Sequence, residues 1–387
     1  MTHVLTISMD ASLLSRTIGD SRQRHLDYAQ RIGTLDIVVC TRGQWAPFNS
    51  APDAALRIRP TVSRFRFAYV PDGYRAARLL TTDRRPDVIT TQDPFLTGLV
   101  GLLLKRRLHV PLIIQDHSSI FSGSRFASES RLTRLLHLLG RLVVRGADAV
   151  RVVNTAERAA CIRLGIPADR VQIIPLPTAL QQFVSPPQPI DWRARLNIAA
   201  DAPTALWVGR VVPVKNLPLL LEAFAIVNAR LPSARLILAG DTVGSAVPAL
   251  IERLRLGDAV RLAGTVSHEL LPALYQAATV YAHSSRYEGF GVVLVEAAAA
   301  GLPLISTMTD GARDIIRPDE TGLIVPDHAD ALADALLTLL TDPERAQAMG
   351  HVAQADVLRR FDPETLAARW VGLWQTVAAA AGSNSDQ

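Results

Sequence analysis

Short apolar runs alternate with helix-like stretches along the whole chain, and this alternation constrains the fold more than any other feature. The runs Val4–Ser8, Val88–Thr91 and Leu112–Gln115 are rich in β-branched residues and carry no charge. Uninterrupted apolar strands are typical of a parallel sheet covered by helices on both faces. The sequence therefore predicts an α/β protein with doubly wound, Rossmann-like architecture.

The alternation occurs twice, and 387 residues are more than one ordinary hydrophobic core holds. Five prolines lie in Pro175–Asp191, which reads as a linker. We predict two doubly wound domains, residues 1–185 and 190–363, that face a cleft. A C-terminal helix, about 364–387, is expected to pack back on the first domain.

A glycine-containing segment lies between the predicted strand Val280–His283 and a predicted helix that begins near Val292. Gly289 and Gly291 lack Cβ atoms, so the backbone there can approach a ligand closely. A helix start presents unbonded N–H groups and a partial positive charge. The segment therefore suggests a pyrophosphate site.

Two glutamates frame this segment. Glu288 precedes the helix, at the level of a bound ligand, and Glu296 lies about one turn inside it. The Glu296 carboxylate could accept two hydrogen bonds from a ribose diol. The alternative is an ordinary strand–helix turn with a solvated glutamate.

Lysine is rare in this chain, because 39 of its 41 basic residues are arginines and only Lys105 and Lys215 are lysines. Lys215 follows Arg210 in the loop after the predicted strand Thr204–Val208. A planar guanidinium and a compact ammonium at the end of a strand suit a leaving diphosphate. Asn216 is expected to cap the next helix. Two surface cations near a cap remain the alternative.

The motifs G-R-x5-K-N, from Gly209, and E-G-F-G-x4-E-A, from Glu288, occur together. Their pairing resembles the retaining glycosyltransferases of family 4, which have the two-domain GT-B fold. The resemblance covers about Ala205 to Asp342 and includes Leu238–Asp241 and Leu262–Val266.

The resemblance implies roles for these residues. Arg210 and Lys215 would bind the donor diphosphate and stabilise it as a leaving group. Glu288 would contact the transferred sugar and Glu296 the ribose, with Val266 near the base. The backbone that would hold phosphate is that of Gly289, Phe290, Gly291 and Val292.

The first half matches the family less closely. Its first loop has one glycine, Gly19, where such enzymes usually have a pair near the donor phosphate. His117 follows the predicted strand Leu112–Gln115, and the resemblance implies that it bonds the sugar or orients the acceptor. A structural histidine is the alternative.

No Asp-x-Asp pair occurs that would hold a divalent cation on a diphosphate, and no His/Cys cluster has zinc spacing. We therefore expect no metal and no cofactor besides the nucleotide-sugar co-substrate. Cations and a helix start would take the place of the metal, and the resemblance suggests that the leaving phosphate itself accepts the acceptor's proton.

Charge is divided unevenly. Residues 1–190 carry 25 Lys and Arg against 14 Asp and Glu, a net +11, and residues 191–387 carry 16 against 22, a net −6. An anionic membrane, a phosphorylated acceptor or nothing specific would fit the basic half. The arginines and leucines of Arg125–Arg145 suggest either an amphipathic helix on anionic lipid or an ordinary covering helix with solvated arginines.

Together with the resemblance, these observations predict a retaining, metal-independent hexosyltransferase that uses a UDP- or GDP-linked sugar and a glycan or lipid-linked acceptor. The resemblance alone implies a role in cell-surface polysaccharide biosynthesis. No nucleic-acid partner is expected. Two cysteines and a polar N-terminus favour a cytoplasmic protein, with peripheral contact at the inner membrane face. The alternatives are a nucleotide-sugar epimerase or phosphorylase on the same fold, or a non-catalytic sugar- or nucleotide-binding scaffold.

Overall fold

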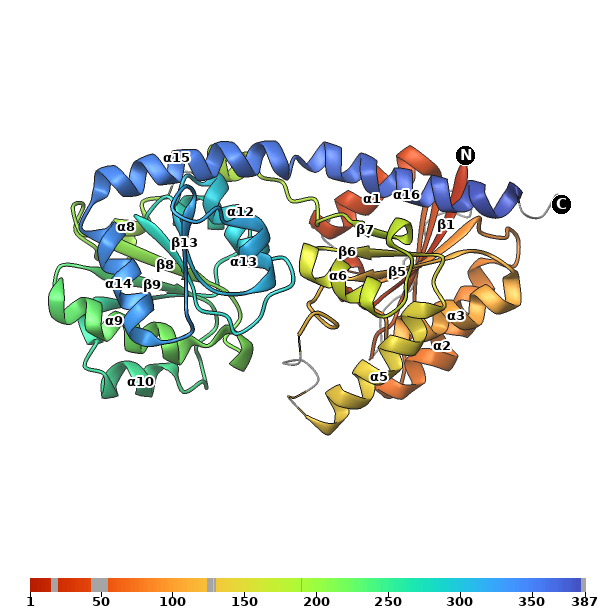
Figure 1. The fold of residues 1–387 in the computed structure, drawn as a ribbon, viewed down its shortest axis with the longest axis horizontal. Helices are drawn as coiled ribbons and strands as arrows, with labels where there is room; N and C mark the ends of the chain where they lie inside the picture. Colours follow the sequence, from red (N-terminus) through yellow and green to blue (C-terminus); the bar gives the residue numbers. More distant parts are fainter. Residues whose placement is uncertain (15–19, 43–54, 124–127, 129, 189, 384–387) are drawn as a thin grey trace. The chain divides into compact units, whose positions relative to one another are not determined.

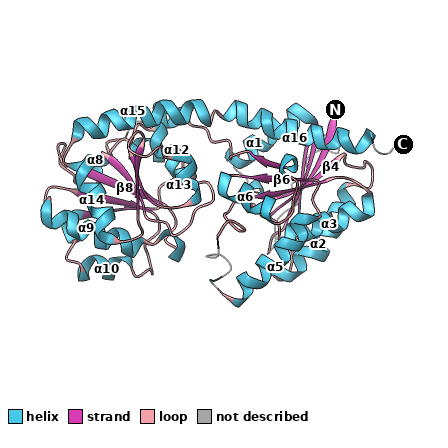
Figure 2. Cartoon of the chain, in the orientation of Figure 1, coloured by secondary structure: helices cyan, strands magenta, loops and turns pink. Residues whose placement is uncertain are grey.

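The computed structural model describes residues 1–14, 20–42, 55–123, 128, 130–188 and 190–383. The chain divides into two compact units. Unit 1 consists of Met1–Pro175 with Thr365–Gln387, and unit 2 of Leu176–Glu364. Each unit is a parallel sheet with helices packed on it, as Figures 1 and 2 show. The predicted α/β class with two Rossmann-like domains is confirmed.

The sheet of unit 1 has seven strands in the order β3-β2-β1-β4-β5-β6-β7, and every pairing is parallel. Successive strands are added on one side of β1 as far as β3 and on its other side from β4 onward, so the strand order reverses between β1 and β4. These two strands are parallel neighbours, and their carboxyl ends lie side by side. The strands are β1 Thr2–Ser8, β2 Gly33–Val39, β3 Leu56–Pro60, β4 Val88–Thr91, β5 Leu112–Asp116, β6 Ala149–Val152 and β7 Val171–Ile173.

Alternate residues of each strand enter two different cores. Leu5 and Ile7 of β1 pack under α2, α3, α5 and α6, whereas Val4 packs under α1 and α16. Figure 1 shows these helices on the two faces of the sheet. They are α1 Asp20–Ile32, α2 Tyr69–Leu80, α3 Leu96–Leu108, α5 Arg131–Arg145, α6 Thr155–Arg163 and α16 Pro363–Ser383.

Helix α16 is held on unit 1 by aromatic packing. Trp374 meets the ring of Tyr28 edge-on, with centroids 5.5 Å apart. Trp370 lies under the guanidinium of Arg151, 4.5 Å from its ring centroid. The same guanidinium donates to the backbone oxygens of Ile174 and Pro175. One buried arginine therefore ties the end of the first segment of unit 1 to its C-terminal helix.

The sheet of unit 2 has six strands in the order β10-β9-β8-β11-β12-β13, also all parallel. The order reverses between β8 and β11, and in such sheets ligands bind beyond the carboxyl ends at this switch point. The strands are β8 Thr204–Val208, β9 Arg235–Ala239, β10 Val260–Gly264, β11 Val280–His283, β12 Leu304–Thr307 and β13 Gly322–Val325.

Helices α9, α10, α14 and α15 of unit 2 bury a core built around Trp207, Phe224 and Leu336. The helices of this unit are α7 Gln181–Val184, α8 Trp192–Arg195, α9 Leu217–Arg230, α10 Val247–Arg253, α11 Leu271–Tyr275, α12 Val292–Ala299, α13 Asp310–Ile315, α14 Ala329–Leu340 and α15 Pro343–Arg360. The short α7 lies inside the proline-rich segment, and its buried Phe183 packs edge-on to Tyr275 at 5.5 Å.

The expected role of Asn216 is wrong. Asn216 stands at the N-cap of α9 but has a left-handed backbone, φ 49°, and its side chain does not cap the helix. Its amide instead donates to Asp327, at 3.3 Å. A capping side chain needs an extended backbone to reach back to the first turn, and the tight turn before α9 excludes that.

Within the part of the chain that the structure describes, no helix combines the length and the apolar character that crossing a bilayer requires.

Candidate functional site

Two loops of unit 2 meet at the switch point. The first follows β8 and ends in the 3₁₀ turn Pro213–Lys215, and the second follows β11 and leads into α12. Ser284 donates its hydroxyl to the backbone oxygen of Lys215, at 2.8 Å, and the Arg286 N–H donates to the backbone oxygen of Val214, also at 2.8 Å. These bonds fix the position of Lys215 against the second loop.

Lys215 forms an ion pair with Glu288 across the two loops. The two side chains are largely buried, with 15% and 22% of their surfaces exposed. The structure therefore brings together two of the residues predicted from the motifs. In this pair the ammonium is neutralised by a carboxylate that an anionic ligand could replace.

His283 lies beneath this pair, at the end of β11. Its Nε2 is 3.6 Å from the Glu288 Oε2, and its side chain is 1% exposed. Burial lowers the pKa of His283 to about 4, so its imidazole is neutral near pH 7. Sequence analysis missed His283; the available signal was a polar residue at the carboxyl end of an otherwise apolar strand.

Gly291, the N-cap residue of helix α12, has φ +85° and offers no side chain to cap the helix. The first amides of such a helix point outward and favour an anion. Phe290 is 3% exposed, and its ring packs on Phe361 with centroids 5.4 Å apart. Gly289, Phe290, Gly291 and Val292 therefore present backbone at the helix start, and the Phe290 side chain belongs to the core.

The start of α13 closes this loop from the other side. The Gly311 N–H donates to the backbone oxygen of Glu288, at 3.0 Å. A Cβ atom on Gly311 would lie 2.3 Å from the backbone oxygen of Phe290. The position requires glycine because the two backbones touch.

Glu296 is buried, with 4% of its surface exposed. Its Oε2 accepts a hydrogen bond from the Tyr275 hydroxyl at 3.0 Å, and its Oε1 lies 3.4 Å from the Nε2 of His268. Burial, and then the charge of Glu296, raises the pKa of Tyr275 well above its usual value, so the tyrosine acts as a donor. A ribose diol bound at Glu296 would donate its hydrogen bonds to the carboxylate lone pairs that the Tyr275 hydroxyl does not occupy.

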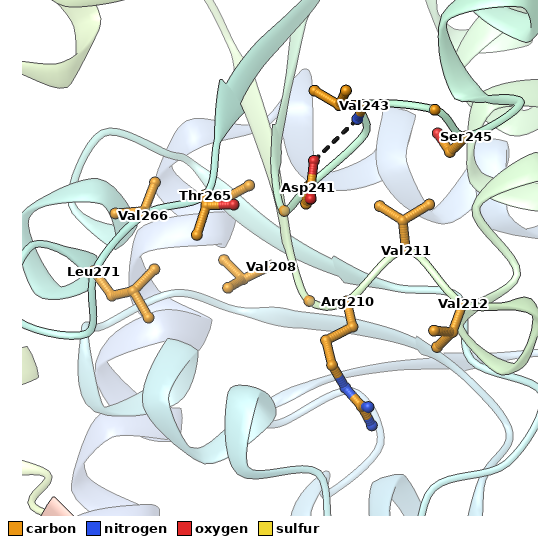
Figure 3. Close-up of a pocket in the computed structure, with 14 residues that line it drawn as sticks. Val208, Arg210, Val211, Val212, Asp241, Val243, Ser245, Thr265, Val266 and Leu271 are labelled. Atoms are coloured by element: carbon orange, nitrogen blue, oxygen red, sulfur yellow. Dashed lines mark hydrogen bonds between the residues drawn. The ribbon is translucent and has the colours of Figure 1, made fainter. Parts of the chain in front are cut away.

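A cavity of about 740 Å³ opens beyond the carboxyl ends of β8, β9 and β10. Its volume lies in the range of small-molecule sites. Figure 3 shows Asp241, which accepts the Val243 N–H at 3.0 Å, and Arg210, whose side chain extends away from Asp241. The cavity is lined by Val208, Gly209, Arg210, Val211, Val212, Ala239, Gly240, Asp241, Val243, Gly244, Ser245, Thr265, Val266 and Leu271.

Arg210 and Val266 thus line one cavity. Lys215 and Glu288 are not among its lining residues; they stand in the neighbouring loops after β8 and β11. The predicted donor residues are therefore distributed around the carboxyl edge of one sheet.

His117 lies in unit 1, directly after β5. Burial, and then the positive charges of Arg151 and Arg24, lowers the pKa of His117 to about 3, so its imidazole is neutral near pH 7. Its buried Nδ1 has no hydrogen-bond partner among the described residues. This nitrogen is closed to solvent, so a ligand's hydroxyl group could bond the half-buried ring only through Nε2. Gly19, the other predicted site residue of unit 1, lies outside the described residues.

The loop after His117 is fastened by two buried carboxyl groups that sequence analysis did not single out. Glu157 accepts the N–H groups of Phe121 and Ser122 at 2.7 and 2.8 Å, and Asp116 accepts that of Ser118 at 2.8 Å. Burial and the adjacent Glu157 raise the pKa of Asp116 well above its usual value. A protonated Asp116 can donate to Glu157, which keeps two acidic groups together.

Two family models match the chain. Residues 190–356 match the model described as Glycosyl transferases group 1, and residues 28–177 match a Glycosyl transferase 4-like domain. These matches fall on the two units separately, and the first contains the Lys215–Glu288 pair.

Curated relatives agree with the models. A D-inositol 3-phosphate glycosyltransferase of Kineococcus radiotolerans is 34% identical over 66% of this chain and 64% of its own length. The Alpha-D-kanosaminyltransferase of Streptomyces kanamyceticus is 31% identical over 65% of this chain and 67% of its own length. Matches to two further D-inositol 3-phosphate glycosyltransferases span 60% and 59% of those proteins, so this chain covers about three fifths of such relatives.

Solved structures extend the likeness to the whole chain. Sucrose-phosphate synthase from Thermosynechococcus elongatus superposes with a TM-score of 0.83 and 27% identity, over 98% of this chain and 100% of that one. Anabaena Alr3699/HepE, solved in complex with UDP, gives a TM-score of 0.72 over 97% of this chain and 100% of that one. At 19% identity, the second comparison speaks for the fold alone.

Proposed function

Because this chain belongs to the group 1 glycosyl transferases, we propose that it transfers a hexose from a UDP- or GDP-linked sugar to a glycan or lipid-linked acceptor. The observation that carries the proposal is the Lys215–Glu288 ion pair, fixed beside the amino end of α12 at the switch point of unit 2. A cation, a carboxylate and open helix amides in one place suit a nucleotide sugar.

The donor would bind along the carboxyl edge of the unit 2 sheet. Its nucleoside would occupy the 740 Å³ cavity near Val266, and its ribose would reach Glu296. Its diphosphate would lie at the start of α12 and draw the ammonium of Lys215 away from Glu288. Glu288 would then be available to bond the hydroxyl groups of the sugar.

Catalysis in this proposal is leaving-group stabilisation. The bond between the anomeric carbon and the diphosphate oxygen breaks, and negative charge grows on the diphosphate. Arg210, Lys215 and the helix amides are placed before the reaction begins, so they stabilise this charge without reorganisation. The acceptor oxygen bonds to the anomeric carbon on the face that the diphosphate leaves, and its proton passes to the leaving phosphate. The product retains its anomeric configuration, and no metal ion is required.

The acceptor would bind to unit 1. His117 is neutral and its side chain is half-buried, so its Nε2 can orient a hydroxyl group of the acceptor or the sugar. The net charge of +11 in residues 1–190 suits an acceptor that carries phosphate. A lipid-linked glycan at the inner membrane face, in cell-surface polysaccharide assembly, has this chemistry.

A panel of nucleotide sugars, each with and without a mixture of glycan and lipid-linked acceptors, tests the proposal. We expect nucleoside diphosphate release that depends on the acceptor and yields an α- or β-linked product of the same configuration as the donor. Phosphate-dependent release of sugar phosphate would indicate a phosphorylase, and a changed sugar without an acceptor an epimerase. Nucleotide binding without any turnover would indicate a scaffold.

A further inference from the structure

Helix α5 carries leucines on its outer side as well as on its inner side. Leu135, Leu138 and Leu142 are 64%, 52% and 67% exposed, and Leu132 is 54% exposed. Spacings of three and four residues place the first three in one stripe along the helix. A row of exposed leucines is not explained by the core, so it indicates a surface that is covered in function.

Arginines lie at the ends of this stripe and along one side of it. Arg131 and Arg145 lie at its two ends, and Arg134 and Arg141 lie three and four residues from the leucines along one flank. The sequence from Arg131 to Arg145 contains no Asp or Glu. The outer face of α5 is therefore both apolar and cationic, the combination that lies in the headgroup region of an anionic bilayer.

Contacts other than those of the outer leucines hold α5 in place. Ser130 and Thr133 form a capping box at its start. On the inner face, the Nδ1 of His137 lies 3.2 Å from the backbone oxygen of Ile120, and Val143 is buried in the core. Since the inner side supplies the packing, the outer leucines are not needed to hold α5 on unit 1.

The neighbouring helix carries further exposed cations. Helix α3 packs beside α5, as Figure 1 shows, and carries exposed Arg106 and Arg107 in its last turn. Its Leu103 is 38% exposed. Arg106 also lines a separate hollow with Asp148, Arg170 and the end of α16, so the apolar and cationic surface is that of α5 itself. A protein partner of ordinary composition would not require so many cations without carboxylates between them.

We propose that α5 is a membrane-docking helix, with Leu135, Leu138 and Leu142 in the interface of an anionic bilayer and its arginines on the lipid headgroups. The inference deepens the proposed function, because it assigns the surface that brings the enzyme to a lipid-linked acceptor. The inner face of α5 also contacts the loop after His117. A Cβ atom on Gly140 would lie 3.3 Å from the ring of Phe121, which follows that histidine by four residues.

Flotation of the full chain with vesicles tests the proposal without any turnover. The vesicles are phosphatidylcholine alone or phosphatidylcholine with about one quarter phosphatidylglycerol, at about 0.1 M and about 0.5 M salt. We expect binding to the anionic vesicles only, weakened at the higher salt. The double variant Leu135→Gln/Leu138→Gln should bind about tenfold more weakly. Arg134→Gln/Arg141→Gln should lose about fivefold for each arginine.

Matched controls come from unit 2. Val352 is 43% exposed on α15, and Arg253 is exposed on α10. Val352→Gln and Arg253→Gln should float like the wild type. All variants should keep the wild-type circular dichroism and the wild-type affinity for nucleoside diphosphate, which separates loss of docking from loss of the donor site.

Three results would contradict the proposal that α5 docks on a membrane. The wild type could fail to bind anionic vesicles, or the leucine variant could bind them as the wild type does. Alternatively, the wild type could self-associate in the absence of lipid while the leucine variant stays monomeric, which would assign the stripe to a second copy of the chain. Failure to transfer sugar would leave the vesicle result intact and would count against the proposed function only.

Discussion

Lys215 and Glu288 are 73 residues apart in the sequence, yet their side chains form an ion pair in the structure. The pair joins the loop after β8 to the loop after β11, the two strands at which the sheet of unit 2 reverses its order. In the proposed function the ammonium leaves Glu288 for the bound diphosphate, so it would face the leaving group before the glycosidic bond breaks.

Removal of the Lys215 ammonium should slow transfer without unfolding unit 2. We expect Lys215→Ala to lower kcat by about 10²–10³-fold, the usual effect of losing one preorganised group at a developing charge. Lys105→Ala is the matched control, since Lys105 is the other lysine and also pairs with a carboxylate, that of Asp148 at 2.6 Å. Steady-state kinetics with the preferred donor measures both. Equal kcat values for the two variants would contradict a role of Lys215 in transfer.

His117 should act on the acceptor side, apart from nucleotide binding. His117→Ala is expected to lower kcat by about 10²-fold, within the range of one positioned hydrogen-bonding group. The Kd of the nucleoside diphosphate should stay within a factor of about two, because the residues that would hold it belong to unit 2. Calorimetric titration and kinetics on one preparation give both numbers. A large change in Kd would place His117 in the donor site instead.

Gly311 should tolerate no side chain. Gly311→Ala places a Cβ against the backbone oxygen of Phe290, at 2.3 Å, and both backbones are held by α12 and α13. We expect a loss of about 1–3 kcal/mol in the stability of unit 2, together with weaker donor binding. A Cβ on Gly372 would meet nothing within 4 Å, so Gly372→Ala is the control. Urea unfolding of both variants gives the comparison, and equal midpoints would contradict it.

The Asp116–Glu157 pair should make unit 1 sensitive to pH. The pKa of Asp116 is raised in the folded state, so the native protein holds a proton that the unfolded chain releases above about pH 4. The contribution of this proton to the free energy of unfolding is complete below the pKa of Asp116 in the unfolded chain. It falls as the pH rises toward the pKa of Asp116 in the folded protein. Asp116→Asn carries a permanent amide donor, and its stability relative to the wild type should therefore increase from pH 5 to pH 8.

Urea midpoints at several pH values, read from a signal of unit 1, test this expectation. Asp201→Asn changes the net charge equally at an exposed position and should shift little with pH. A wild type and an Asp116→Asn variant that change in parallel with pH would show that no proton is shared with Glu157.

Much of the sheet of unit 2 could be predicted from the sequence. The bounds of β8 and β11 agree with the expected strands, and α12 begins at Val292, where a helix was expected. Parallel strands are buried on both faces, so each appears as a short apolar run between turns. The open backbone at the start of α12 was also predictable, because the glycines there lack Cβ atoms.

Other features depend on tertiary contacts that no local pattern encodes. Strand β3, Leu56–Pro60, alternates Leu, Arg, Ile and Arg at the edge of its sheet, so it lacks the apolar run of a central strand. The approach of His283 to Glu288 and the pairing of Asp116 with Glu157 join residues five to 41 positions apart. Only the folded chain shows that these groups share a buried space.

The central claim is that the diphosphate of the donor rests at the start of α12 against Arg210 and Lys215. Calorimetric titration with a nucleoside diphosphate and with its parent nucleoside measures the diphosphate's share of binding directly. In the wild type the diphosphate should bind at least about 100-fold more tightly, since two charge-assisted contacts are involved. The double variant Arg210→Ala/Lys215→Ala should lose most of this ratio while its affinity for the nucleoside stays unchanged. If the double variant keeps the wild-type ratio of diphosphate to nucleoside affinity, Arg210 and Lys215 do not hold the diphosphate.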